Sequence, residues 1–256
     1  RKKDKMYINK SKYNEIFFDF IIPKNYNGKL IIILPGLPEY PRPKEIMIKL
    51  ADKGYSVIYP KYRGTFESKG SFLEKSPAYD ILELIDYISH YGKIIDLFFM
   101  KEVRLNINEI IVLASSFGSS VGLHLAKLTN KVKKFVLIAP VIDFASHNNG
   151  NNEQDLENLG RFIKRGYPFI YRFKEGNYKR LLKGNIIPSA LDKIKSYSGK
   201  IVIVHGEDDE VVSLKNSINF VSKFPSAELI KLKGKGHFSV SNINEELLNG
   251  VLKWNL

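Results

Sequence analysis

Short, almost wholly apolar runs recur along the chain at intervals that predict a buried parallel sheet. Five of them are rich in β-branched residues, as is typical of strands covered on both faces. They span residues 29–35, 55–60, 109–114, 134–140 and 200–206. The run at 15–22 alternates enough to predict an earlier, partly exposed strand, and the run at 227–234 predicts the last strand.

Segments with helical periodicity lie between the predicted strands. They cover residues 43–53, 77–91, 117–129, 213–224 and 243–254. Strand and helix patterns therefore alternate, which indicates an α/β fold with a mostly parallel central sheet and helices on both faces. Because 256 residues are enough to bury the core of one such domain, we expect a single domain over residues 1–256.

The interval 141–199 interrupts this alternation. It contains no strand candidate, begins with the polar linker SHNNGNNEQD at 146–155, and continues with aromatic residues in helical patterns. A structureless loop of that length is uncommon in a compact domain. We interpret 141–199 as a small helical cap inserted over the carboxyl ends of the strands, where α/β sheets bind ligands. The alternative is an extra packing layer that does not contact substrate.

The composition narrows the classes of partner. The chain carries 40 basic and 27 acidic residues, a formal net charge of +13, which suits an anionic partner. However, the basic residues are scattered and no nucleic-acid-binding motif accompanies them, so a lysine-rich proteome is the preferred explanation and no nucleic acid is expected. There is no cysteine, which excludes disulfides, thiolate metal sites and a cysteine nucleophile.

Targeting signals are scarce in the sequence. No apolar run reaches the length of a transmembrane helix, so no membrane span is expected. No signal peptide is visible, and a cytoplasmic location is the default expectation. The chain opens with RKKDK and without a starting methionine, which is also compatible with a removed leader.

Four serines lie in the stretch IIVLASSFGSSVGLHLA at 110–126. A nucleophile on a sharp strand-to-helix turn requires small residues two positions before and two positions after it. Ser115 and Ser119 fail this test, whereas Ser116 and Ser120 pass it, and the literal G-x-S-x-G motif is centred on Ser120. Ser116 directly follows the predicted strand, while Ser120 falls inside the helix, where its hydroxyl can bond a backbone carbonyl. We therefore predict Ser116 as the nucleophile.

A serine nucleophile requires a general base, normally a histidine. His237 lies in the flexible loop GKGHF, after the last predicted strand, and can fold back across the strand ends. We expect the other four histidines to be structural or exposed: His90 ends a helix pattern, His124 lies on the helix after Ser116, His147 is solvated in the Asn-rich linker, and His205 is a structural residue before a turn.

The base in turn requires a carboxylate that orients it. The segment KIVIVHGEDDEVV places several acidic residues after the strand that ends at Gly206. Asp209 is preferred because two valines follow closely and anchor the next segment, and Asp208 is the alternative. The chain order is then Ser116, Asp209, His237, as in hydrolases with a nucleophile elbow.

A tetrahedral intermediate also requires two backbone N–H donors for its oxyanion. The residue after the predicted nucleophile, Phe117, supplies one. The second is expected from a loop after an early strand, and the turn Pro35-Gly36-Leu37 occupies that place. We therefore predict Leu37 as the second donor.

Together these segments resemble the α/β-hydrolase superfamily across about residues 14–254. The resemblance rests on LPGL (34–37), ASSFG (114–118), HGEDDEVV (205–212) and GKGHF (234–238), and YPKYRGTFESKGSF (59–72) is similar to the prolyl-oligopeptidase-like and dienelactone-hydrolase-like branches. Two departures stand out: Ala114 where glycine is usual, and LPG where HG is common. No β-propeller precedes the domain, which weakens a peptidase interpretation.

The resemblance implies an α/β-hydrolase fold and a serine hydrolase that cleaves a carboxylic ester through an acyl-enzyme intermediate. It implies a small-molecule acyl substrate and no metal or organic cofactor. The alternatives are a peptidase or aminoacyl-amide hydrolase of the same fold, and a non-catalytic ligand-binding protein. An apolar acyl pocket is predicted from Leu37, Tyr40, Val141, Phe144 and Phe238.

Overall fold

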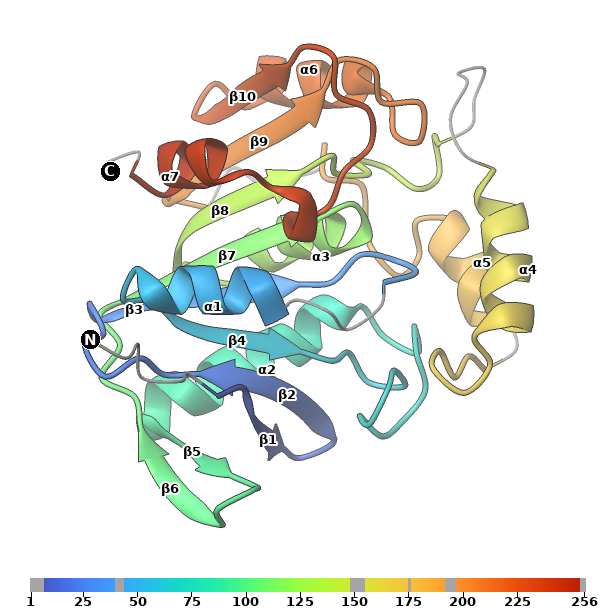
Figure 1. Cartoon of the computed structure of the whole chain (residues 1–256). Coiled ribbons are helices and arrows are strands. Elements are labelled where there is room, and N and C mark those ends of the chain that lie inside the picture. The colour runs from blue at the N-terminus through green and yellow to red at the C-terminus, as the bar shows by residue number, and fades with distance from the viewer. Residues whose placement is uncertain (1–6, 40–43, 148–154, 175, 192–196, 254–256) are drawn as a thin grey trace.

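The computed structural model describes residues 7–39, 44–147, 155–174, 176–191 and 197–253 (Figure 1). Its centre is an eight-stranded sheet in the order β1-β2-β4-β3-β7-β8-β9-β10. These strands are β1 (Asn9–Tyr13), β2 (Ile16–Ile21), β3 (Lys29–Leu34), β4 (Ser56–Pro60), β7 (Glu109–Ser115), β8 (Val132–Ile138), β9 (Lys200–Gly206) and β10 (Ala227–Leu232). Only β1 and β2 run antiparallel to their neighbours, so the predicted α/β fold with a mostly parallel sheet is confirmed.

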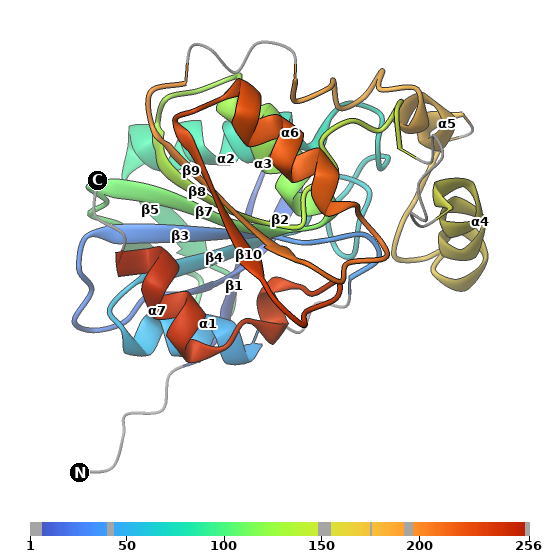
Figure 2. The same ribbon diagram turned by 90° about the horizontal axis from the view of Figure 1, so that it is seen from above.

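Side chains of the central strands alternate between two buried cores, one on each face of the sheet. Along β3, Leu30, Ile32 and Leu34 join one core, while Ile31 and Ile33 join the other. This is why the strand reads as a continuous apolar run. Figure 2 shows α2 (Pro77–Tyr91), α3 (Phe117–Ala126) and α6 (Leu214–Lys223) on one face, and α1 (Lys44–Asp52) and α7 (Glu245–Lys253) on the other.

The sequence patterns did not predict three short strands. β1 is a polar edge strand, NKSKY, with one buried position, Ser11. β5 (Lys93–Asp96) and β6 (Lys101–Arg104) form a separate two-stranded hairpin of four-residue strands. Because most of the side chains in these strands are not buried, their sequences carry no apolar run.

The interval 141–199 contains two helices and no strand within its described residues: α4 (Leu156–Gly166) and α5 (Asn177–Leu182). Asp155 caps α4 by accepting hydrogen bonds from the amides of Glu157 and Asn158. Figures 1 and 2 show both helices at the side of the molecule toward which the parallel strands point. Bridges Thr65↔Tyr171 and Phe72↔Phe173 attach the interval to the loop after β4.

A short 3-10 turn, Val240–Asn242, precedes α7. Within the described ranges, none of the helices combines the length and the apolar character needed to cross a membrane.

Candidate active site

Ser116 occupies a strained turn between β7 and α3. Its backbone has φ 51° and ψ −123°, a region that non-glycine residues rarely adopt. The Ser116 amide donates to the carbonyl of Ile138 at 2.8 Å, which fixes the turn against β8. Gly118 must be small, because a Cβ atom there would lie 2.4 Å from the carbonyl oxygen of Leu34. Strand, turn and helix therefore meet as a nucleophile elbow requires.

Two of the three neighbouring serines bond the backbone through their hydroxyls, whereas the buried Ser115 hydroxyl has no hydrogen-bond partner among the described residues. The Ser119 hydroxyl donates to the Ile138 carbonyl at 2.9 Å, and the Ser120 hydroxyl donates to the Val141 carbonyl at 2.8 Å. Both side chains are buried inside α3. Ser120, at the centre of the literal motif, thus bonds mainly a carbonyl in the loop after β8, while the Ser116 carbonyl, one helical turn back, lies 3.5 Å from its hydroxyl.

The structure brings His237 and Asp209 together. His237 Nδ1 lies 2.8 Å from Asp209 Oδ2. The other carboxylate oxygen of Asp209 accepts hydrogen bonds from the amides of Val211 and Val212, both at 2.9 Å. Asp208, the alternative acid, instead donates its amide to the Lys235 carbonyl at 2.9 Å. That bond joins the loop after β9 to the loop after β10.

His205 adds a contact that sequence reasoning missed. It is fully buried, and its Nε2 lies 2.9 Å from the Val212 carbonyl and 3.3 Å from Asp209 Oδ2. Its Nδ1 lies 2.8 Å from the hydroxyl of Ser217 on α6. Burial raises the pKa of Asp209, but hydrogen bonds from His205, His237 and Val212 outweigh it and hold that pKa well below its usual range.

Ser116 and His237 come from loops at the same carboxyl edge of the sheet. No hydrogen bond joins their side chains in the described part of the chain. Hydrogen bonds between catalytic groups are often long without substrate and tighten in the Michaelis complex. The arrangement therefore gives an oriented imidazole and a serine on a strained backbone, without a direct hydrogen bond between the two side chains.

The loop after β3 packs against Ser116. A Cβ atom on Gly36 would lie 3.8 Å from the Cβ of Ser116. The amides of Leu37 and Phe117 have no acceptor within the described residues. For Phe117 this follows from its place as the first residue of α3, where helical N–H groups lack partners. Both predicted donors thus have N–H groups available for an anion.

Glu39 was not singled out by the sequence patterns, yet it belongs to this loop. Its carboxylate accepts the amide hydrogen of Gly36. Its backbone amide donates to the Tyr171 hydroxyl at 2.9 Å, which ties the loop to the segment between α4 and α5. Burial raises the pKa of Glu39, and the Gly36 hydrogen bond opposes this.

A small apolar cavity of about 30 Å³ adjoins Ser116. Of the predicted pocket residues, Leu37, Val141 and Phe144 line it. Phe238 does not, because it packs against the core on the other face of the sheet, and Tyr40 lies outside the described residues. The remaining lining residues are Phe117, His147, Leu156, Leu159, Tyr178, Leu181, Val211 and Val212.

His147 corrects another expectation. It was predicted to be solvated, but its side chain is only 7% exposed and lines the cavity. The residues contributed by α4 and α5 were missed as well. Their signal was the helical spacing of apolar residues such as Leu156 and Leu159, which indicates a buried face without saying what it covers. No cluster of acidic or histidine side chains suited to a metal ion occurs within the described ranges.

A family model described as alpha/beta hydrolase fold matches residues 29–181. A search of curated protein sequences finds no match.

Solved structures resemble the whole chain. Est1E from Butyrivibrio proteoclasticus with ferulic acid bound has a TM-score of 0.65 and 20% identity, over 95% of this chain and 96% of that chain. An alpha/beta hydrolase from Penicillium sp. sh18 has a TM-score of 0.69 and 17% identity, over 97% of this chain and 96% of that chain. A Pyrococcus furiosus esterase has a TM-score of 0.63 and 16% identity, over 91% of this chain and 82% of that chain. At these identities the likeness concerns the fold alone.

Proposed function

The chain belongs to the alpha/beta hydrolase fold family, and from that premise we propose that it is a serine hydrolase that cleaves carboxylic esters through an acyl-enzyme intermediate. The observation that carries this proposal is the backbone of Ser116, held at φ 51° directly after β7. Such strain costs about 1–3 kcal/mol and is concentrated at functional positions. Esterases among the structural neighbours support a hydrolase.

In the proposed acylation step, the Ser116 Oγ attacks the ester carbonyl carbon while the His237 Nε2 accepts its proton. Asp209 accepts the Nδ1–H of His237, at 2.8 Å, and stabilises the imidazolium that forms. The amides of Leu37 and Phe117 stabilise the oxyanion. Collapse of the tetrahedral intermediate breaks the carbon–oxygen bond, and the imidazolium protonates the leaving alcohol.

Deacylation repeats these roles with water as the nucleophile. His237 removes a proton from water, the resulting hydroxide attacks the acyl carbonyl, and the same two amides stabilise the second oxyanion. His237 then returns the proton to Ser116 Oγ, releasing the carboxylic acid. Every proton transfer uses one imidazole, whose orientation depends on Asp209.

The cavity beside Ser116 supports a short acyl group. Its volume of about 30 Å³ leaves room for only a small group. Its walls are mainly aliphatic and aromatic, so they suit a methyl or ethyl group. Leu156 and Leu181 reach it from α4 and α5, and we accordingly propose that interval 141–199 is a cap inserted into a single domain over residues 1–256.

Two other functions remain as alternatives with the same fold. A peptidase or aminoacyl-amide hydrolase would use the same groups on a carbon–nitrogen bond. A non-catalytic binding protein would use the cavity without turnover, since a fold does not determine a function. An available serine hydroxyl and an oriented histidine favour catalysis over binding alone.

A matched set of substrates tests the proposal. We expect nitrophenyl acetate to be hydrolysed with a kcat/KM roughly 100-fold above that of nitrophenyl octanoate, because the long chain exceeds the cavity. Nitroacetanilide, the amide with the same acyl group, should react far more slowly. Ser116→Ala should lose about 10³-fold or more in kcat, since it removes the nucleophile.

Ser120→Ala is the matched control, because it removes a neighbouring buried hydroxyl in the same turn-helix segment. It should retain activity within a few-fold of the wild type. Faster cleavage of the anilide than of the ester would favour the amide hydrolase instead. Full activity in Ser116→Ala would refute the mechanism.

A further inference from the structure

The hairpin of β5 and β6 presents an apolar tip to solvent. Phe98, Phe99 and Met100 are 60%, 66% and 76% exposed. Figure 1 shows this hairpin at the opposite end of the molecule from α4 and α5. Three consecutive large apolar side chains with such exposure form a patch of the kind that marks an interaction site.

The backbone of the tip is fixed. Asp96 is buried, and its Oδ1 accepts the amides of Phe98 and Phe99 at 2.9 and 3.3 Å. Its Oδ2 accepts Asn9 Nδ2 at 2.9 Å, and the amide of Leu97 donates to β1. Because these bonds hold the turn against β1, the apolar side chains point outward as part of the folded structure.

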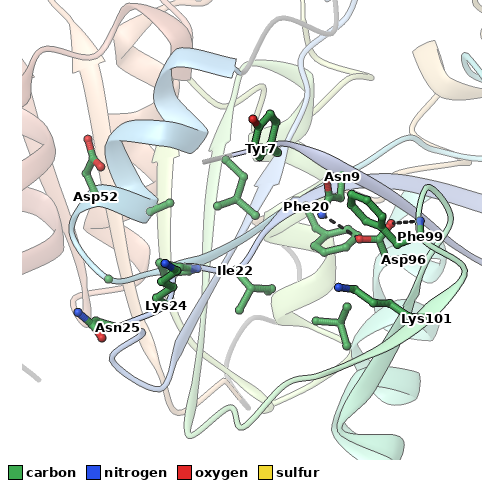
Figure 3. Close-up of a pocket in the computed structure, with 15 residues that line it drawn as sticks. Tyr7, Asn9, Phe20, Ile22, Lys24, Asn25, Asp52, Asp96, Phe99 and Lys101 are labelled. Atoms are coloured by element: carbon green, nitrogen blue, oxygen red, sulfur yellow. Dashed lines mark hydrogen bonds between the residues drawn. The ribbon is translucent and has the colours of Figure 1, made fainter. Parts of the chain in front are cut away.

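A cavity of about 520 Å³ adjoins the tip (Figure 3). Phe20, Ile22 and Val103 contribute apolar walls, and Phe99 and Lys101 reach it from the hairpin. The Lys101 Nζ lies 5.1 Å from the centroid of the Phe99 ring, a cation–π contact. An ammonium group thus lies directly beside the exposed aromatic ring.

We propose that this tip, residues 97–101, docks the protein on an anionic lipid surface. Phe98, Phe99 and Met100 insert among the headgroups, as apolar side chains of interfacial proteins do. Lys101, which directly follows the three apolar residues, then lies next to the lipid charges. The source of the anion is the bilayer itself, not a free phosphate.

The positive charge of the protein favours an anionic lipid surface over a second copy of the chain as the partner of the tip. The net charge is +13, so two copies repel each other, while an anionic surface attracts either.

The docked orientation leaves the Ser116 cavity away from the lipid. The cavity beside the tip includes Ile21, which pairs with Val57 at the start of β4. Ser116 instead follows the carboxyl end of β7. Parallel strands place these two positions at opposite edges of the sheet, so lipid docking is independent of the proposed hydrolysis.

Vesicle sedimentation tests the proposal. Wild-type protein should bind vesicles of equal parts phosphatidylglycerol and phosphatidylcholine but not vesicles of phosphatidylcholine alone. Added salt should weaken this binding, because it screens the basic side chains. Phe99→Ser should reduce partition about tenfold by removing one inserted ring.

Phe169→Ser is the matched control, since Phe169 is 89% exposed but lies between α4 and α5. It should bind like the wild type, as should Ser116→Ala. Failure of the wild type to bind anionic vesicles would overturn the proposal, and so would equal loss in Phe99→Ser and Phe169→Ser. A wild-type dimer that Phe99→Ser dissociates, without vesicle binding, would assign the tip to self-association.

Discussion

Asp209 is surrounded by four N–H groups, and this surplus of donors determines how the carboxylate should respond to pH. The amides of Val211 and Val212 approach one oxygen, while His237 and His205 approach the other. The pKa of Asp209 is therefore depressed, so the group stays ionised as the pH falls through the range where an ordinary aspartate gains a proton.

His205→Leu removes one of these donors. Its loss raises the pKa of Asp209 and loosens the carboxylate that orients His237. We expect kcat to fall about tenfold at neutral pH, the size typical of a lost supporting hydrogen bond. His205→Gln, whose side-chain amide can reach the same oxygen of Asp209, should retain most of the wild-type kcat. The measurement is kcat at neutral pH for the wild type and both variants, with urea denaturation as a check that each variant is folded.

His124→Leu provides the control for that experiment. His124 is also buried and bonded to a serine, with its Nδ1 2.7 Å from the Ser76 hydroxyl. Its loss should lower stability without a comparable fall in kcat. An unchanged kcat in His205→Leu would show that His205 has a packing role only.

At the scale of elements, the elbow depends on how closely α3 approaches β3. A Cβ atom on Gly118 would lie 2.4 Å from the Leu34 carbonyl oxygen and 2.6 Å from that of Pro35. Neither backbone atom can move without disturbing the loop that carries Leu37. Gly118 therefore allows the strand-turn-helix unit to close.

Gly118→Ala should lower the free energy of unfolding by about 1–3 kcal/mol, through overpacking, and should reduce ester hydrolysis by displacing Ser116. Gly250→Ala is the matched control, because no atom lies within 4 Å of a Cβ atom there in α7. It should raise that free energy by about 0.5–1 kcal/mol. Urea denaturation measures both. Unchanged stability in Gly118→Ala would contradict the close approach.

Elements buried on both faces were predictable from their sequences. The run at 200–206 gives β9 over the same residues, since six of its seven positions are buried. β6 has no buried position, so its sequence carries no apolar pattern. The carboxyl end of β8 also differed from the prediction: the strand ends at Ile138, because Ala139 adopts φ 45° and departs from the extended backbone of a strand.

At the scale of the whole molecule, the candidate site was predictable as far as local spacing determines it. Small residues around Ser116 and the position of Asp209 after β9 are both local patterns. His147 was not predictable, because its burial depends on α4 and α5, which follow it in the sequence. The contact between His205 and Asp209 likewise required the loop geometry after β9.

Two surfaces at opposite ends of the molecule then have separate roles in this account. Ser116 and its cavity lie at the carboxyl edge of the sheet, beside α4 and α5, while the apolar tip lies on the hairpin at the other end (Figure 1). The central claim concerns the first surface: Ser116 is the nucleophile.

Labelling with a fluorophosphonate, followed by intact-mass measurement, tests that claim most directly. The reagent transfers its phosphonyl group to an activated serine with loss of fluoride. Wild type and Ser120→Ala should each gain one adduct, and Ser116→Ala should gain none. An adduct on Ser116→Ala, or an unlabelled wild type, would contradict the assignment of Ser116 as the nucleophile.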